Sequence, residues 1–135
     1  MATFRQIKHM ASGLDDEQLT QPHIKKLAHN IVDFGYRGAP ILYIPQVAII
    51  DGHDRLAALC LIDKWIMNAR NWTPDFEAAL MMLNKQEIAE DVTDIVYKYM
   101  VDHDCQEYED LPIGHLGDMF EGTRIEEYKK YIKQW

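Results

Sequence analysis

The sequence predicts an α/β (α+β) fold, in which a small mixed sheet is extended by helices toward the C-terminal end of the chain. Three observations carry this prediction. The β-branched apolar run Val47–Ile50 ends in Asp51-Gly52, and a helical apolar pattern begins directly after it. A second apolar run, Pro40–Ile44, precedes it across Pro45-Gln46, and this short join predicts a hairpin. From residue 73 onward, the apolar residues recur mainly at helical spacing.

The N-terminal elements follow from local patterns. A short first strand is expected within Thr3–Met10, followed by turn residues over Ala11–Asp16. A helix is expected from Thr20, as its N-cap, to Gly35, where the chain can leave the helix. The helix after Gly52 is expected to run from His53 to about Asn68. The helix before Gly35 has its apolar stripe at Ile24, Leu27, Ala28, Ile31 and Val32.

The second half of the chain is predicted to form three helices. Thr73-Pro74 is a favourable N-cap and first-turn pair for a helix through Leu83. Asn84 and Glu87 resemble a capping box, which predicts a second helix reaching Met100. A last helix is expected near Ile125–Trp135. Because no repeat or low-complexity linker interrupts the chain, residues 1–135 are expected to form one domain, with residues 73–135 as its mainly helical extension.

The net charge limits the kinds of molecule that the protein is expected to bind. The net charge of −8, from 22 acidic and 14 basic residues, argues against DNA, whose binding depends on cationic contacts to phosphates. It suits a protein partner with a basic surface. No apolar run has the roughly 18 residues of a membrane helix, and the N-terminus lacks a signal-peptide core, so a cytoplasmic protein without a membrane partner is expected. The sequence leaves a homodimer open.

The cysteines and several histidines do not form a metal pattern. Cys60 and Cys105 lack metal-ligand spacing, and Cys60 lies in an apolar helical run, which favours a buried thiol. A disulfide is left open, although cytosolic thiols are normally reduced. His103, Asp104 and His115 match no zinc template, so they are interpreted as structural.

The junction at Gly52 carries the main chemical signal. A strand that turns into a helix leaves the first N–H groups of that helix available to an anion, and the helix dipole favours negative charge there. Arg55 could fork onto two phosphate oxygens, or it could form an ion pair with Asp51 or Asp54. His53 could donate a hydrogen bond or carry a proton. Asp54 could hold Mg²⁺, or it could only stabilise the helix start.

The segment Asp51-Gly52-His53-Asp54-Arg55-Leu56-Ala57-Ala58 resembles the phosphate-binding box of the ParB/sulfiredoxin superfamily, in which Gly-x-x-Arg-x-x-Ala opens a helix after a strand. The preceding layout is also similar, with Gln21-Pro22-His23 at a helix start, Phe34-Gly35 at its end and Pro40-Ile41-Leu42 opening a strand. The resemblance covers Thr20–Leu61, about a third of the chain.

The resemblance implies a nucleotide-binding protein that uses ATP or CTP with Mg²⁺, and a slow nucleotide phosphohydrolase or phosphotransferase. On this interpretation we expect nucleotide contacts from Asp51, Gly52, His53 and Arg55. The side-chain chemistry of His53 and Asp54 adds the expectation that both are catalytic and that Asp54 binds the metal. Phe34 and Tyr36 are left open as flanking groups for the base.

The chain also departs from the family pattern. The Glu and second Arg of the partitioning proteins are absent, and no Cys stands where sulfiredoxins carry their nucleophile, which argues against sulfinic acid reduction. The alternative is therefore a catalytically inactive, acidic protein-interaction module that keeps the fold.

Overall fold

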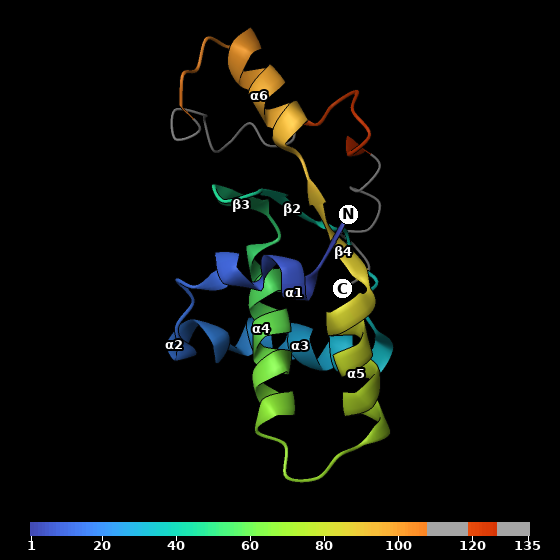
Figure 1. The fold of residues 1–135 in the computed structure, drawn as a ribbon. Coiled ribbons are helices and arrows are strands. Elements are labelled where there is room, and N and C mark those ends of the chain that lie inside the picture. The colour runs from blue at the N-terminus through green and yellow to red at the C-terminus, as the bar shows by residue number, and fades with distance from the viewer. Residues whose placement is uncertain (108–118, 127–135) are drawn as a thin grey trace.

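The computed structural model describes residues 1–107 and 119–126. In it a mixed sheet lies between α6 (Thr93–Asp102) and the other helices (Figure 1). The strands within these ranges are β1 (Ala2–Thr3), β2 (Ile41–Ile44), β3 (Ala48–Asp51) and β4 (Glu87–Asp91). Their spatial order is β1-β4-β2-β3. β2 and β3 form an antiparallel hairpin, β2 runs parallel to β4, and β1 runs antiparallel to β4. The α/β class, the mixed sheet and the hairpin are thereby confirmed.

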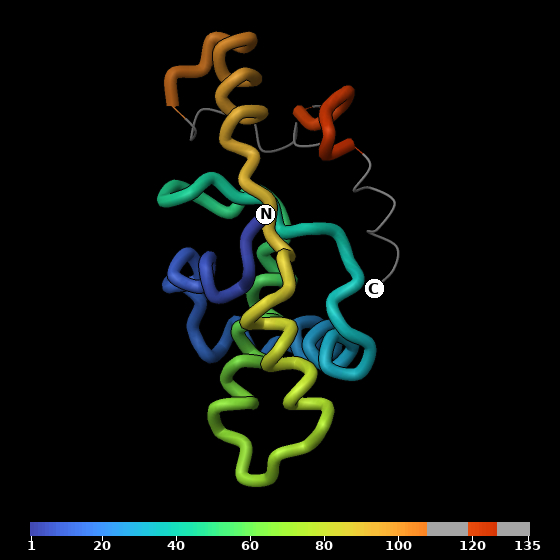
Figure 2. Tube along the Cα trace, turned by 45° about the vertical axis from the view of Figure 1, so that its right-hand side comes forward, coloured from blue at the N-terminus to red at the C-terminus, as the bar shows by residue number. Residues whose placement is uncertain are grey.

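The helices lie on both sides of this sheet. α4 and α5 run side by side and are joined at their far end by a loop, as both views show (Figures 1 and 2). α6 lies on the opposite side of the sheet. None of the helices in the described ranges has the length and apolar content that a membrane crossing requires. The helices are α1 (Phe4–Ile7), the 3₁₀ helix η1 (Lys8–Ala11), α2 (Asp16–Leu19), α3 (Pro22–Phe34), α4 (His53–Met67), α5 (Pro74–Lys85) and α6 (Thr93–Asp102).

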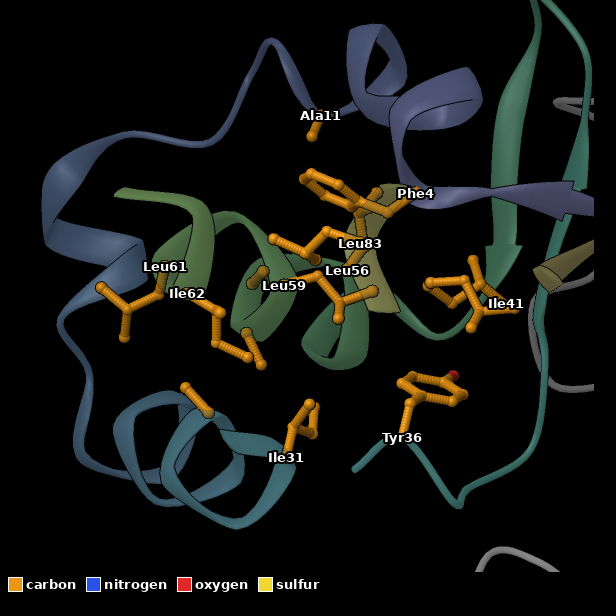
Figure 3. Packing of buried hydrophobic residues seen from close by; sticks show 14 of the residues in the cluster. Phe4, Ala11, Ile31, Tyr36, Ile41, Leu56, Leu59, Leu61, Ile62 and Leu83 are labelled. Carbon is orange, nitrogen blue, oxygen red and sulfur yellow. The ribbon is translucent and has the colours of Figure 1, made fainter. Parts of the chain in front are cut away.

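The larger hydrophobic core lies between the sheet and α1, α3, α4 and α5. Leu59 of α4 lies between Phe4 and Ile31 (Figure 3), and all three side chains are almost completely buried. Burying a Leu or Phe side chain of this kind contributes about 1.5–3 kcal/mol. This core therefore fixes α4, whose first residue follows Gly52.

A smaller core covers the other face of the sheet. Leu42 and Ile50 contribute from the hairpin, and Val96 contributes from α6. Phe120 and Ile125, from the described segment 119–126, complete it. Both faces of the hairpin are thus covered, which explains why its strands are apolar without strict alternation.

Two of the expected elements are wrong. The first strand ends at Thr3, because Thr3 and Gln6 form a capping box that starts α1. The capping box expected at Asn84 and Glu87 does not form either, since α5 continues through Lys85 and residues 87–91 form strand β4. The pairing of β4 with both β1 and β2 overrides the helical pattern of this short apolar segment.

Other local predictions are confirmed. Gly35 ends α3 at φ 82°, and its N–H donates to the Ile31 carbonyl. Thr73 caps α5 by accepting from the Phe76 N–H at 3.2 Å. The N-cap of α3 is Gln21 rather than Thr20, because Pro22 occupies the first helical position. The helix expected over Ile125–Trp135 lies mostly outside the described residues.

One buried carboxylate ties the N-terminal segment to α4. Asp63 is 3% exposed, with Oδ1 2.8 Å from the Arg5 guanidinium and Oδ2 accepting from Lys8 Nζ at 2.7 Å. Burial acts to raise the pKa of Asp63, but the hydrogen bonds from the two cations outweigh it and hold the pKa below its ordinary value. Burial raises the pKa of the nearby Cys60 thiol to about 11, so this cysteine is an unreactive thiol.

We expect Asp63→Asn to lower the free energy of unfolding by about 1–2 kcal/mol at pH 7. This is less than for a fully buried pair, because Arg5 and Lys8 reach solvent. Since the folded pKa of Asp63 is depressed, its contribution is present above the unfolded value of about 3.9 and is lost as pH falls through the folded value. Urea unfolding at pH 7 and at lower pH should show the difference shrinking with acidification.

Asp16→Asn is the matched control, because Asp16 forms an exposed ion pair with Lys64. Exposed pairs contribute little, so this variant should unfold like the unmodified protein at both pH values. A difference for Asp63→Asn that does not change with pH would show that lost packing, not lost charge, causes it.

Candidate anion-binding site

Gly52 forms the corner between β3 and α4. It has φ 99° and ψ 25°, in the left-handed region, and it is the N-cap of α4. The Leu56 N–H donates to the Gly52 carbonyl at 2.9 Å, which begins the helical bonding. Within the described residues no side-chain cap closes this helix end. The sharp turn and the open first turn therefore agree with the geometry that the sequence led us to expect.

Glycine is favoured at position 52 by its positive φ and by close internal packing. A Cβ at position 52 would lie 3.1 Å from Ile41 Cγ1, 3.3 Å from Ile41 Cα and 3.3 Å from Arg55 Nη2. The sequence alone attributes the need for glycine at this position partly to the close approach of a ligand. The neighbours that a side chain at position 52 would meet are Ile41 of β2 and the Arg55 side chain.

Arg55 points into the protein rather than away from it. Its side chain is 11% exposed, and Nη2 lies 3.4 Å from Asp51 Oδ2. Nη1 donates to the Ala39 carbonyl and lies 3.4 Å from the Pro40 carbonyl. Of the two alternatives that the sequence left open, the ion pair with Asp51 is therefore formed. The contacts join the segment before β2 to the start of α4.

Asp51 and Tyr36 complete this internal network. Asp51 Oδ1 accepts from the Gly52 N–H at 3.0 Å. The Tyr36 hydroxyl donates to the Ala39 carbonyl at 2.6 Å, the same oxygen that accepts from Arg55. Burial raises the pKa of Tyr36 to about 12, although Arg55 acts in the opposite direction, so the hydroxyl stays neutral.

The two aromatic residues proposed to flank a base are placed differently from each other. Tyr36 is buried beside Ile41 (Figure 3), so it cannot stack on a ligand at the surface. Phe34 is exposed, and the Arg37 guanidinium lies 5.1 Å from its ring centroid.

His53 and Asp54 are the exposed side chains of the junction. Asp54 Oδ1 lies 3.8 Å from His23 Nε2, and both side chains are more than half exposed. His23 is the second residue of α3, so the segment Gln21-Pro22-His23 lies beside the start of α4 in space. Such an exposed pair contributes little to stability, which leaves both side chains free to contact a ligand.

A small hollow adjoins the start of α4. Its volume is about 130 Å³, and His53 belongs to a lining whose other residues are apolar or glycine. The lining comes from η1 and the turn after it, from β3 and from α4. It comprises Met10, Ala11, Gly13, Leu14, Ile49, His53 and Leu56.

The side chains at the start of α4 could hold a metal ion only together with a ligand that supplies further donors. Within the described residues, no group of three or more His, Cys, Asp or Glu side chains could hold a metal ion. Asp54 can supply one carboxylate. Mg²⁺ is commonly bound through one or two carboxylates together with nucleotide phosphates and water, so Asp54 fits Mg²⁺ that arrives with a nucleotide.

Comparison of the chain with protein-family models, with curated proteins and with solved structures finds no match.

Sequence reasoning identified the junction but missed its internal partners. Arg55 contacts the Ala39 carbonyl, sixteen positions away in the sequence. Because every residue has a main-chain carbonyl, no residue type in the sequence indicates this contact. The buried Asp63 did leave a signal, because it is a single carboxylate within the apolar run of α4.

Proposed function

We propose that the start of α4 binds the phosphates of a nucleotide. The observation that carries the proposal is Gly52, a left-handed N-cap that turns a strand into a helix without a side-chain cap. Backbone N–H groups at such a corner, together with the helix dipole, bind anions without help from a charged side chain. The resemblance of residues 51–58 to a phosphate-binding box supports the same assignment.

The neighbouring side chains suit a nucleotide better than a free phosphate. The imidazoles of His53 and His23 lie on the exposed side of the junction and can donate hydrogen bonds. The apolar hollow of about 130 Å³ beside His53 offers a surface to a base or a sugar. Nucleotide sites combine such an apolar surface with a few well-placed polar groups.

Arg55 acts in this proposal as a positioning residue. Its guanidinium is held by Asp51 and by the carbonyl groups before β2, so it fixes the corner whose N–H groups bind the anion. The side chain that remains for Mg²⁺ is Asp54. Fast phosphoryl transfer uses metal ions together with several cationic groups, and we therefore propose binding with slow turnover or none.

Isothermal titration calorimetry with ATP, CTP, GTP and inorganic phosphate, each with and without Mg²⁺, tests the proposal. We expect nucleoside triphosphates to bind and inorganic phosphate to bind more weakly, since it lacks the base. At about 1 mM nucleotide, even a binding free energy of about −4 kcal/mol would be detected. Absence of heat at that concentration would overturn the proposal.

The sign of the effect at Asp54 separates its two roles. Asp54→Asn should strengthen ATP binding without Mg²⁺, because it removes a negative charge near the phosphates, and weaken it with Mg²⁺, because it removes a metal ligand. A change of about threefold to tenfold in each direction is expected, measured by the same calorimetry. Asp75→Asn is the control, since Asp75 holds the same second position in α5 and is also exposed. If both variants behave alike, Asp54 only stabilises its helix.

A second candidate function is protein interaction without nucleotide chemistry. Its specific support is the engagement of Arg55 by protein oxygens, since this is the arrangement that a purely structural junction would have. A protein that binds no nucleotide in the calorimetric series, yet retains its fold and a protein partner, would favour this candidate.

A further inference from the structure

The negative charge of this protein is confined to one part of the chain. Residues 1–86 contain nine acidic and nine basic residues and are neutral overall. Residues 87–135 contain thirteen acidic and five basic residues and carry the entire net charge of −8. Among the described residues, the acidic part begins in the sheet at β4 and continues into α6, which lies on the side of the sheet opposite to α3, α4 and α5 (Figure 1).

Part of this acidic surface is already paired within the protein. Arg124 donates to Glu90 of β4 at 2.9 Å and to Asp94 in the first turn of α6 at 2.8 Å, so it offsets part of the negative charge there. Among the described residues, no Lys or Arg side chain forms an ion pair with the carboxylates at the other end of α6. Asp102 and Asp104 are exposed at its C-terminal end, and its last turn contains no basic residue.

This placement of charge runs against the helix dipole. The C-terminal end of a helix is its negative end, where cations stabilise and carboxylates destabilise. Glu107 adds a third exposed carboxylate just beyond Asp102 and Asp104. Features that break a local rule without a compensating contact are expected at functional sites. A cationic partner would supply that compensation.

A hollow with a volume of about 560 Å³ lies beside these carboxylates. Its lining includes Tyr97 and Val101 of α6, Val47 of the β2–β3 turn, and Cys105 and Glu107 beyond the helix. Val101 is 78% exposed, and Tyr97 and Val47 are each about half exposed. Large apolar side chains exposed together around a hollow mark an interaction surface.

Two turns of the backbone shape the walls of the hollow. Asp104 takes φ 58°, and the chain reverses there so that the Cys105 N–H donates to the Met100 carbonyl at 2.8 Å. In both views the β2–β3 turn projects from the sheet on the side where the chain descends after α6 (Figures 1 and 2). The lining of the hollow therefore comes from two parts of the fold, the β2–β3 turn and the segment from α6 to Glu107.

We propose that this hollow binds a cationic amphipathic helix of another protein. Its apolar face would fill the space between Tyr97, Val101 and Val47, and its Lys or Arg side chains would pair with the carboxylates at the end of α6. The mode is that of a helix in a groove, in which apolar anchors supply affinity and charges supply orientation and association rate. Nucleic acid and anionic membranes carry the wrong charge for this surface.

The test uses the full chain and a fluorescent model peptide with Leu on one helical face and Lys on the other. Fluorescence anisotropy should show saturable binding that weakens as salt is added. A peptide with Glu in place of Lys, and one with Ser in place of Leu, should each bind at least tenfold more weakly. Failure of the unmodified protein to bind the Leu/Lys peptide would overturn the proposal.

Matched variants separate this surface from general electrostatic attraction. Val101→Lys should weaken peptide binding at least tenfold, or about 1.4 kcal/mol. Met67→Lys adds the same charge at a site on α4 that is 75% exposed, and it should change binding less than about twofold. Val47→Lys tests the other wall and should act like Val101→Lys. Equal losses for Val101→Lys and Met67→Lys would overturn the proposal.

The oligomeric state distinguishes a foreign helix from a second copy of this chain. Light scattering coupled to size-exclusion chromatography should give a monomer for the unmodified protein and for Val101→Lys. A dimer that Val101→Lys dissociates would overturn the proposal, because a second copy would then cover the hollow. Circular dichroism should show unchanged folding, since Val101 and Met67 are both largely exposed.

Discussion

Gly52→Val is expected to lower the free energy of unfolding by about 3–5 kcal/mol, a large fraction of the 5–15 kcal/mol that stabilises a typical domain. Two costs combine. A β-branched residue at φ 99° is strained by about 1–3 kcal/mol. The added side chain also meets Ile41 from 3.1 Å outward, including its Cα, which cannot move aside as a side chain can. Such overpacking costs a further 1–3 kcal/mol or so. Chemical denaturation at neutral pH measures the sum.

Three glycine-to-alanine variants separate the cost of backbone strain from the cost of overpacking. Gly13 has open space around it and no positive φ, so Gly13→Ala should be neutral or slightly stabilising. Gly35 has φ 82° and open space, so Gly35→Ala should cost only the backbone strain. Gly52→Ala should cost more than either, because it adds contact with β2. Equal destabilisation by Gly35→Ala and Gly52→Ala would mean that the contact with Ile41 contributes nothing.

The same series bears on the proposed phosphate site. Since a Cβ at position 52 would face Ile41 and Arg55, it would not cover the N–H groups of the helix start directly. Gly52→Ala should therefore weaken nucleotide binding mainly by displacing Arg55 and the corner it fixes. A folded Gly52→Ala protein with unchanged affinity would place the ligand elsewhere.

Local signals predicted much of the fold correctly. Thr73-Pro74 and Gly35 work through their own backbone chemistry, so their effects on helix ends can be read without tertiary knowledge. The hairpin across Pro45-Gln46 is similar, because its two apolar runs are adjacent in the sequence. The capping box of Thr3 and Gln6 was also available in the sequence, and it was missed because the segment was interpreted as a strand.

The features that the sequence did not predict depend on contacts between residues far apart in the chain. Glu87–Asp91 becomes a strand because β1 and β2 lie on either side of it, and both partners come from distant parts of the chain. The site shows the same limit. The box around Gly52 was predicted together with its turn geometry, but the direction of the Arg55 side chain depends on the Ala39 carbonyl, which any residue at that position would offer. Residue identity predicts which groups are present, and packing decides which way they point.

The expected result at Arg55 tests that distinction. Arg55→Ala should lower the free energy of unfolding by about 2–4 kcal/mol, because it leaves the buried Ala39 carbonyl with one partner fewer and removes the charge that faces Asp51. Arg55→Lys should cost roughly half as much, since an ammonium group keeps the charge but cannot reproduce the fork. Arg37→Ala is the control: Arg37 is exposed and lies over the exposed Phe34 ring, so its loss should cost less than about 0.5 kcal/mol.

Measuring nucleotide affinity on the same variants decides what Arg55 does. If Arg55 positions the corner, Arg55→Lys should lose stability and nucleotide affinity together, because the helix start shifts as its anchor weakens. If Arg55 contacts phosphate, Arg55→Lys should lose affinity about tenfold while stability stays unchanged, which would require the ion pair with Asp51 to open when the ligand binds. The buried position of the guanidinium favours the first outcome, since moving it to a ligand would break its contacts with Asp51 and with the Ala39 carbonyl at once.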